Sequence, residues 1–248
     1  MTTPNMNHKL TRFADLSHRL RPILKRVPGL RSAWYLSSHL RDMLSYRTAR
    51  SRNDLDQLFE ETTDPWQFDE PMEQARYHRE LSMIIDAHGP NRIGRAMEIG
   101  CAEAMFTRNL AGYCDSLLAV DLSPVALLRA QQRCAHLPQV RCAEFDVRSD
   151  TPPGTFDLII ASCVLEYIVW PATMRRVRSR LVSSIAPGGL LLVSNTAGND
   201  VLDHAWWGRV LIRGGKWISY FFGTHPALEI VAEEETAHHL DTLFQKRR

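Results

Sequence analysis

Long hydrophobic runs are missing from this sequence of 248 residues. Its most apolar stretch, residues 158–170, is interrupted by Glu166 and is shorter than the roughly 20 residues that a membrane-spanning helix needs. The first 20 residues also lack the apolar segment of a secretory signal. We therefore expect a cytoplasmic protein that does not span a membrane.

Paired cysteines and metal-ligand spacings are absent as well. The five cysteines are scattered and none of them forms a Cys-x-x-Cys pair, which argues against a disulfide framework and against a zinc ribbon. The His, Asp and Glu residues show no metal-binding spacing either. We expect a reducing compartment and no metal cofactor.

Acidic residues are scarce only near the start of the chain. Residues 1–52 hold eleven Lys and Arg against two Asp, a balance of +9, whereas the rest holds 19 basic and 26 acidic residues, a balance of −7. Apolar residues recur at helical spacing within 9–26, so we expect residues 1–52 to form a basic helical arm. We favour an arm that packs on the body or on the second subunit of a homodimer. The alternative is peripheral contact with an anionic surface, with nucleic acid the less favoured partner.

Strand and helix signals alternate after residue 94, which is typical of a parallel sheet covered by helices. We predict an α/β fold with a doubly wound, mostly parallel, seven-stranded, Rossmann-like sheet and an α-helical N-terminal extension. The core should span residues 94–248, and helices in 53–93 should form a cap over the active site. The predicted strands are 95–99, 116–120, 140–143, 156–161, 190–195, 228–232 and 240–244.

Polar residues near the ends of the first three predicted strands indicate a nucleoside site. Gly100 lies in a turn where the backbone can approach a ligand at a helix N-terminus. Asp121, 21 residues later, closes the second strand, where a carboxylate can accept two hydrogen bonds from a ribose diol. Glu98 would repel a pyrophosphate at this turn and favour an ammonium or sulfonium group. Asp146 follows the third strand and could accept a hydrogen bond from an adenine amino group. Ribose, adenine and a cationic amino-acid tail together describe S-adenosylmethionine (SAM).

Residues from about 94 to 195 resemble a class I SAM-dependent methyltransferase. The resemblance implies that the turn around Gly100 wraps the methionine part of the cofactor, that Asp121 holds the ribose hydroxyls and that Asp146 lies beside adenine. Ala102 and Ala104 stand where glycines are often found. SAM is the implied cofactor, and the implied cofactor-binding residues are Glu98, Gly100, Cys101, Ala102, Asp121, Leu122, Asp146, Val147, Ser162 and Cys163.

A narrower resemblance begins at the segment 64–68, with the sequence Asp-Pro-Trp-Gln-Phe, and continues through the following helix to Trp207-Gly208. This pattern is similar to the nodulation protein S group, which N-methylates the amino sugar at the end of a chitooligosaccharide. It implies a small-molecule or saccharide acceptor. The implied substrate-binding residues are Trp66, Arg76, Tyr77, Trp207 and Arg209.

Two residues depart from the pattern of that group. Glu166 stands where a second aromatic residue is expected before Tyr167, and Arg209 follows Trp207-Gly208 where a His is usual. Both positions belong to the region that would hold the acceptor. The acceptor can therefore differ from that of the group even where the methyl donor is the same.

Methyl transfer from a sulfonium ion is an in-line displacement, for which the enzyme mainly supplies positioning. An amine acceptor must arrive unprotonated, which a base or a desolvating aromatic wall favours. The candidate catalytic residues are Glu166, Tyr167 and His204. Two other functions stay open, an O-methyltransferase of a sugar or secondary metabolite and a non-catalytic nucleotide-binding protein that docks through its basic arm. An NAD-dependent oxidoreductase is disfavoured, because Glu98 opposes a pyrophosphate and glycines of the dinucleotide pattern are missing.

Overall fold

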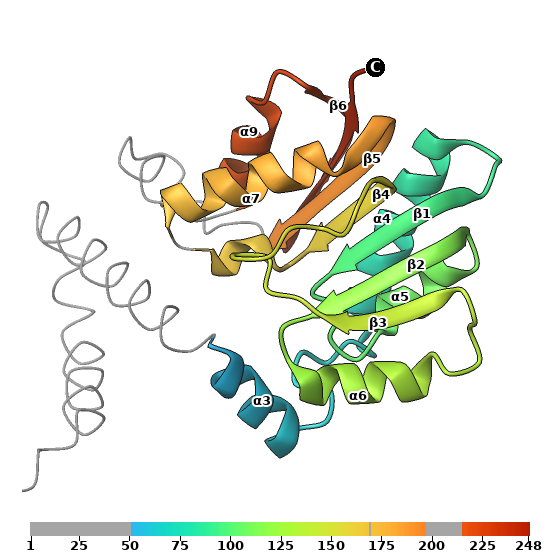
Figure 1. Cartoon of the computed structure of the whole chain (residues 1–248), viewed down its shortest axis with the longest axis vertical. Helices are drawn as coiled ribbons and strands as arrows, with labels where there is room; N and C mark the ends of the chain where they lie inside the picture. The colour runs from blue at the N-terminus through green and yellow to red at the C-terminus, as the bar shows by residue number, and fades with distance from the viewer. Residues whose placement is uncertain (1–50, 169, 197–214) are drawn as a thin grey trace, which may run out of the picture. The chain divides into compact units, whose positions relative to one another are not determined.

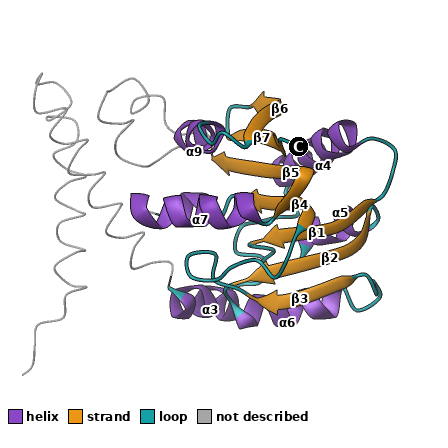
Figure 2. Ribbon diagram, turned by 45° about the horizontal axis from the view of Figure 1, so that its top comes forward, coloured by secondary structure: helices purple, strands orange, loops and turns teal. Residues whose placement is uncertain are grey.

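The computed structural model describes residues 51–168, 170–196 and 215–248. Within them, seven strands form one sheet in the order β3-β2-β1-β4-β5-β7-β6. Figure 2 shows this order from β3 at the bottom to β6 at the top. The strands are β1 (Ile93–Ile99), β2 (Cys114–Asp121), β3 (Val140–Glu144), β4 (Phe156–Ser162), β5 (Ile185–Thr196), β6 (Leu228–Glu235) and β7 (His239–Lys246).

The prediction of a mostly parallel, seven-stranded sheet is confirmed. Strands β1 to β5 pair in parallel, and β7 runs antiparallel to both of its neighbours, β5 and β6. Each of the seven predicted strands lies within an observed one. Strand β4 is central, as its composition predicts, because its residues 158–161 are fully buried on both faces of the sheet.

Helices cover both faces of the sheet (Figure 1). One face packs against α4, α5 and α6, and the other against the turn η1 and the helices α7 and α9. No helix among the described residues is long and apolar enough to cross a membrane. The helices are α3 (Arg52–Glu61), α4 (Pro71–His88), α5 (Met105–Ala111), α6 (Pro124–Arg133), the 3-10 turn η1 (Leu165–Tyr167), α7 (Pro171–Ser183) and α9 (Gly215–Gly223).

Helix α3 lies almost wholly within 53–93, where cap helices are expected without stated bounds, whereas α9 is not among the elements that the sequence patterns predict. Helix α3 begins with a capping box, in which the Ser51 side chain accepts a hydrogen bond from the Asp54 backbone and the Asp54 side chain accepts one from the Ser51 backbone. Its mostly polar sequence buries Phe59 alone, which leaves little hydrophobic periodicity to detect. The predicted arm lies outside the described residues, apart from the first residues of α3.

The order of the strands fixes where a ligand can bind. From β1 the chain moves outward to β2 and β3, then returns to β4 and continues to β5 on the other side. The sheet therefore has its switch point between β1 and β4, where open α/β sheets bind ligands beyond the carboxyl ends of the strands. Glu98, Asp121 and Ser162 all lie at this end.

Candidate functional site

The turn after β1 has a left-handed backbone at alternate residues. Gly100, Ala102 and Ala104 have φ angles of 77°, 46° and 65°. A side chain at Gly100 would also crowd Val164, since a Cβ atom at this position would lie 3.1 Å from the Val164 side chain. Glycine is therefore required at Gly100 by conformation and by space. The two alanines, at positions where the resemblance expects glycine, adopt the same unusual conformation and are buried.

Asp121 joins this turn to the end of β2. One carboxylate oxygen accepts from the Ala102 backbone N–H and the other from the Ser123 backbone N–H, both at 2.9 Å. Burial raises the pKa of Asp121, and these backbone hydrogen bonds act against that rise. A carboxylate has about four acceptor sites, so Asp121 is held in place with capacity left for a diol. Its neighbour Leu122 is half-buried.

Glu98 is buried beneath the same turn, with 5% of its surface exposed. It accepts one hydrogen bond, from the Thr107 hydroxyl at 2.6 Å. Burial raises the pKa of Glu98 to about 7, although the hydrogen bond from Thr107 acts in the other direction. A cation placed beside this carboxylate would stabilise its ionised form.

The segment before α4 covers the turn. Phe59 of α3 is buried and packs with Ala102 and Ala126. The Ser123 hydroxyl, which caps α6, donates to Asp56 of α3. Trp66 continues this cover, with its ring 5.2 Å from that of Phe59 and 6.0 Å from that of Phe68. Part of the segment 53–68 thus packs on Ala102 of the turn, and a cap over the active site stays a prediction.

Asp146 follows β3, and its carboxylate is engaged by its own loop. Both oxygens accept from the Arg148 guanidinium, at 2.8 and 2.9 Å. Partial burial acts to raise the pKa of Asp146, but the hydrogen bonds from Arg148 leave it below its usual value. Its neighbour Val147 packs partly against the core. A hydrogen bond from an adenine amino group would use what acceptor capacity remains.

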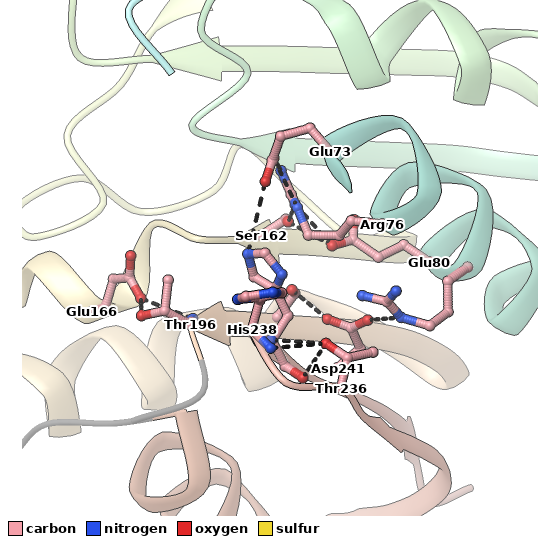
Figure 3. A network of polar contacts seen from close by, with 12 residues as sticks. Glu73, Arg76, Glu80, Ser162, Glu166, Thr196, Thr236, His238 and Asp241 are labelled. Carbon is pink, nitrogen blue, oxygen red and sulfur yellow. Dashed lines mark hydrogen bonds and ion pairs between the residues drawn. The ribbon is translucent and has the colours of Figure 1, made fainter. Parts of the chain in front are cut away.

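Helix α4 brings a buried ion-pair network to the ends of β4 and β7 (Figure 3). Arg76 is 3% exposed and donates to Glu73, Glu80 and Ser162. These bonds use four of its five N–H groups. The family resemblance implies that Arg76 binds substrate. In the structure its guanidinium fixes Glu80 and Ser162 in the interior.

Glu80 is fully buried and is only partly satisfied. Its Oε1 accepts from Arg76 and from the Ser162 hydroxyl, whereas its Oε2 has no hydrogen-bond partner among the described residues. Burial raises the pKa of Glu80. Asp241 of β7 extends the network by accepting from Arg79 and from Ser194. The sequence patterns indicate neither acid as a site residue, although the spacing of four residues between Arg76 and Glu80 is that of a helical ion pair.

Tyr77 lies in the aromatic part of the core. It is 4% exposed, its ring lies 5.2 Å from that of Phe106, and the Arg76 guanidinium lies over it. Trp66, Phe68 and Tyr77 form a row of neighbouring rings. Trp66 is half-buried and Tyr77 is buried, so of these two predicted substrate contacts Trp66 is the more accessible.

The other predicted site residues that the structure describes lie mostly near the carboxyl ends of β4 and β5. Cys163 follows β4 with a left-handed φ of 52°, and burial raises the pKa of its thiol. Cys101 is buried in the first turn, where burial likewise raises the pKa of the thiol. Glu166 accepts from both the backbone N–H and the hydroxyl of Thr196, at 3.1 and 2.7 Å (Figure 3). Tyr167 ends the same 3-10 turn.

The structure therefore gathers most of the predicted cofactor residues at one end of the sheet. Glu98, Gly100 and Asp121 meet at β1 and β2, while Ser162 and Cys163 stand at the end of β4. The described residues contain no cluster of His, Cys, Asp and Glu that could hold a metal ion. The arrangement can hold a diol at Asp121 and a cation at Glu98. His204, Trp207 and Arg209 fall outside the described residues.

Known proteins with similar sequences share this region of the chain. The family model for nodulation protein S matches residues 49–214. Nodulation protein S of Sinorhizobium fredii is 35% identical over 126 residues, which cover 51% of this chain and 57% of that protein. An uncharacterized methyltransferase of Mycobacterium tuberculosis is 30% identical over 124 residues, which cover 50% of this chain and 61% of that protein. The chain spans about half the length of the curated relatives it matches.

A solved structure agrees with the fold. The N-methyltransferase NodS from Bradyrhizobium japonicum WM9, in complex with S-adenosyl-L-homocysteine (SAH), superposes with a TM-score of 0.65. It is 27% identical in sequence, and the match covers 75% of this chain and 94% of that one. The fold described above is thus that of a class I SAM-dependent methyltransferase.

Proposed function

The chain belongs to the nodulation protein S family, and we propose that it transfers the methyl group of SAM to the nitrogen of a small-molecule or saccharide amine, most concretely an amino sugar. The observation that carries the proposal is the position of Glu98 and Asp121 at the carboxyl ends of the adjacent strands β1 and β2, beside the switch point of the sheet. One carboxylate is fixed by two backbone N–H groups, and the other is buried under the adjacent turn.

The residues at this end of the sheet fit SAM. Asp121 retains acceptor capacity for a ribose diol, and Gly100 gives the turn its left-handed backbone beside Val164. Glu98 offers negative charge to a cation and would repel the pyrophosphate of a dinucleotide. When bound, SAM supplies a methyl group on a sulfonium sulfur, which is already an activated leaving group.

The chain's own residues position the methyl donor and the acceptor and exclude water from the site between them. The turn, held by Asp121 and covered by Phe59, forms a rigid floor for the donor. Aligning donor and acceptor can supply up to about 7–11 kcal/mol in the favourable limit. An amine must lose its proton before attack, and Glu166 is a candidate base, because its Oε2 is bound to Thr196 while its Oε1 accepts no hydrogen bond from the described residues. Tyr167 and His204 remain the other candidates.

The test is methyl transfer from isotopically labelled SAM to a panel of amino sugars, simple amines, phenols and RNA. Mass spectrometry identifies the product that gains a methyl group and the atom that carries it. We expect the label on an amine nitrogen, and on amino sugars in preference to phenols. Label on a phenol or sugar hydroxyl would replace the proposal with an O-methyltransferase. Binding of SAM without transfer to any member of the panel would exclude all of these acceptors.

A further inference from the structure

Asn195, next to last in β5, is a buried amide without a hydrogen-bond partner among the residues that the structure describes. It is 1% exposed, and neither its Oδ1 nor its Nδ2 atom meets a partner among the described residues. Leaving a buried polar group unsatisfied costs about 1–3 kcal/mol, so native proteins seldom do so without a reason. The carboxyl end of a central strand is where α/β sheets bind ligands. An orphaned amide at this place indicates a ligand that completes it.

The neighbours of Asn195 place it on the sheet face that the η1 turn covers, at the carboxyl end of β5. Val193, two residues earlier, packs in the cluster that contains Leu165 and Ile168, at either end of the η1 turn. Side chains two apart in a strand lie on the same face, so Asn195 lies on the face covered by this turn. The next residue, Thr196, is bound through its N–H and hydroxyl to Glu166 of the turn. Ser194 lies on the opposite face, where it donates to Asp241.

The chemistry of the two side chains specifies what they can bind. An asparagine amide offers one acceptor oxygen and two N–H donors on adjacent atoms. Glu166 adds a carboxylate whose Oε1 accepts no hydrogen bond from the described residues. The Oδ1 atom of Asn195 favours a ligand N–H group, and its Nδ2 donors favour an oxygen close to that nitrogen. An amine beside a hydroxyl, as in a 2-amino sugar, presents both.

We propose that Asn195 binds the methyl acceptor, with Oδ1 accepting from the amine N–H and Nδ2 donating to the hydroxyl on the adjacent carbon. This inference rests on the proposed function and names the residue that selects the acceptor. An N–H group held by Oδ1 orients the nitrogen and leaves its lone pair for the methyl group. Asn195 thereby selects vicinal amino alcohols over simple amines.

The test compares Asn195→Leu and Asn195→Asp with wild type and with the control Ser194→Ala. The probe is chitotetraose with a free amine on its non-reducing-end sugar, together with the same probe lacking the 3-hydroxyl of that sugar. For Asn195→Leu we expect kcat/KM to fall about thirtyfold or more, with affinity for SAH within about twofold of wild type. Its melting temperature should not fall, because the substitution removes an unsatisfied buried amide.

The other variants sharpen the assignment. Wild type should prefer the probe with the 3-hydroxyl, and Asn195→Leu should lose that preference. Asn195→Asp should retain methyl transfer, but the acid limb of its pH–rate profile should shift to higher pH. The reason is that an ionised carboxylate raises the pKa of the bound amine. Ser194→Ala removes a partnered hydroxyl on the opposite face, so it should lower the melting temperature and leave the preference for the 3-hydroxyl unchanged.

Two failures are distinguishable. If the wild-type protein binds SAH but never methylates the probe, the proposal of an amino-sugar acceptor is wrong, and this inference is wrong with it. If the wild-type protein is active and Asn195→Leu has a kcat/KM within about threefold of it, only the role of Asn195 is wrong. A parallel loss of SAH affinity in Asn195→Leu would also overturn it, because the residue would then serve the cofactor or the fold.

Discussion

Two halves of the carboxyl edge of the sheet differ in whether their buried polar groups have hydrogen-bond partners in the chain. In the donor half, at the ends of β1 and β2, both Asp121 oxygens and one Glu98 oxygen receive hydrogen bonds from the chain itself. In the half proposed for the acceptor, at the ends of β4 and β5, Asn195 has no partner for its whole amide among the described residues. One oxygen of Glu80, on the opposite face of the sheet, also lacks a partner among them.

The two halves are therefore suited to ligand binding in different ways. The donor half is preorganised, because two backbone N–H groups fix Asp121 and the Thr107 hydroxyl holds Glu98 before any ligand arrives. In the proposed acceptor half the Asn195 amide is unsatisfied, and a matching ligand can recover its cost of about 1–3 kcal/mol. A preorganised half suits a methyl donor of fixed chemistry, and an unsatisfied half suits selection among acceptors.

The largest effect is expected from breaking the network behind the acceptor half. Arg76→Ala leaves Glu80 buried without its cation, which typically costs about 3–5 kcal/mol of unfolding free energy. Denaturant unfolding measures this loss. The double variant Arg76→Met with Glu80→Leu removes both charges and should recover most of it, because apolar replacements of buried pairs are often neutral. A single variant that loses less than about 1 kcal/mol would show that the pair is not buried as described.

Asp121 tests the donor half. Asp121→Ala should weaken SAM binding by about 1.5–3 kcal/mol, because it removes an ionised acceptor. It also deprives the Ala102 and Ser123 N–H groups of their partner, so we expect a measurable loss of stability in a protein that still folds. Asp115→Ala is the matched control on the same strand, where the exposed pair with Arg92 contributes little. Calorimetric affinity for SAM within about twofold of wild type would place the ribose elsewhere.

A smaller effect is expected from pH. The pKa of Glu98 is raised to about 7 by burial, so its negative charge is lost as pH falls through that value. A cationic ligand lowers that pKa on binding, so SAM affinity should fall between about pH 8 and about pH 6, by up to about tenfold for one pKa unit. Calorimetry at both pH values measures the change, and Glu98→Gln should abolish it. The same slope in wild type and in Glu98→Gln would assign the titration to another group.

The donor half can be predicted from the sequence because its groups come from short segments. Glu98 and Gly100 are two residues apart, and Asp121 ends the next strand, so strand periodicity brings them together. The central strands are predictable for the same reason, since β1, β4 and β5 each contain a local apolar run. The spacing does not show that Asp146 is engaged by Arg148.

The acceptor half depends on contacts that no local pattern encodes. Glu80 reaches Ser162 across 82 positions of sequence, and Ser194 reaches Asp241 across 47. Asn195 is notable only because a partner is missing, which requires the packed structure to detect. The bounds of helix α3 escape prediction because it buries one large side chain on a mostly polar sequence.

The central claim is that the donor half binds SAM, and titration calorimetry of the wild-type protein tests it most directly. We predict that SAM and SAH bind in the micromolar range typical of enzyme ligands and that NAD gives no binding heat. The reason is Glu98, which favours a cationic tail and opposes a pyrophosphate, beside Asp121, which holds a ribose. Tight binding of NAD together with no binding of SAM would contradict the account.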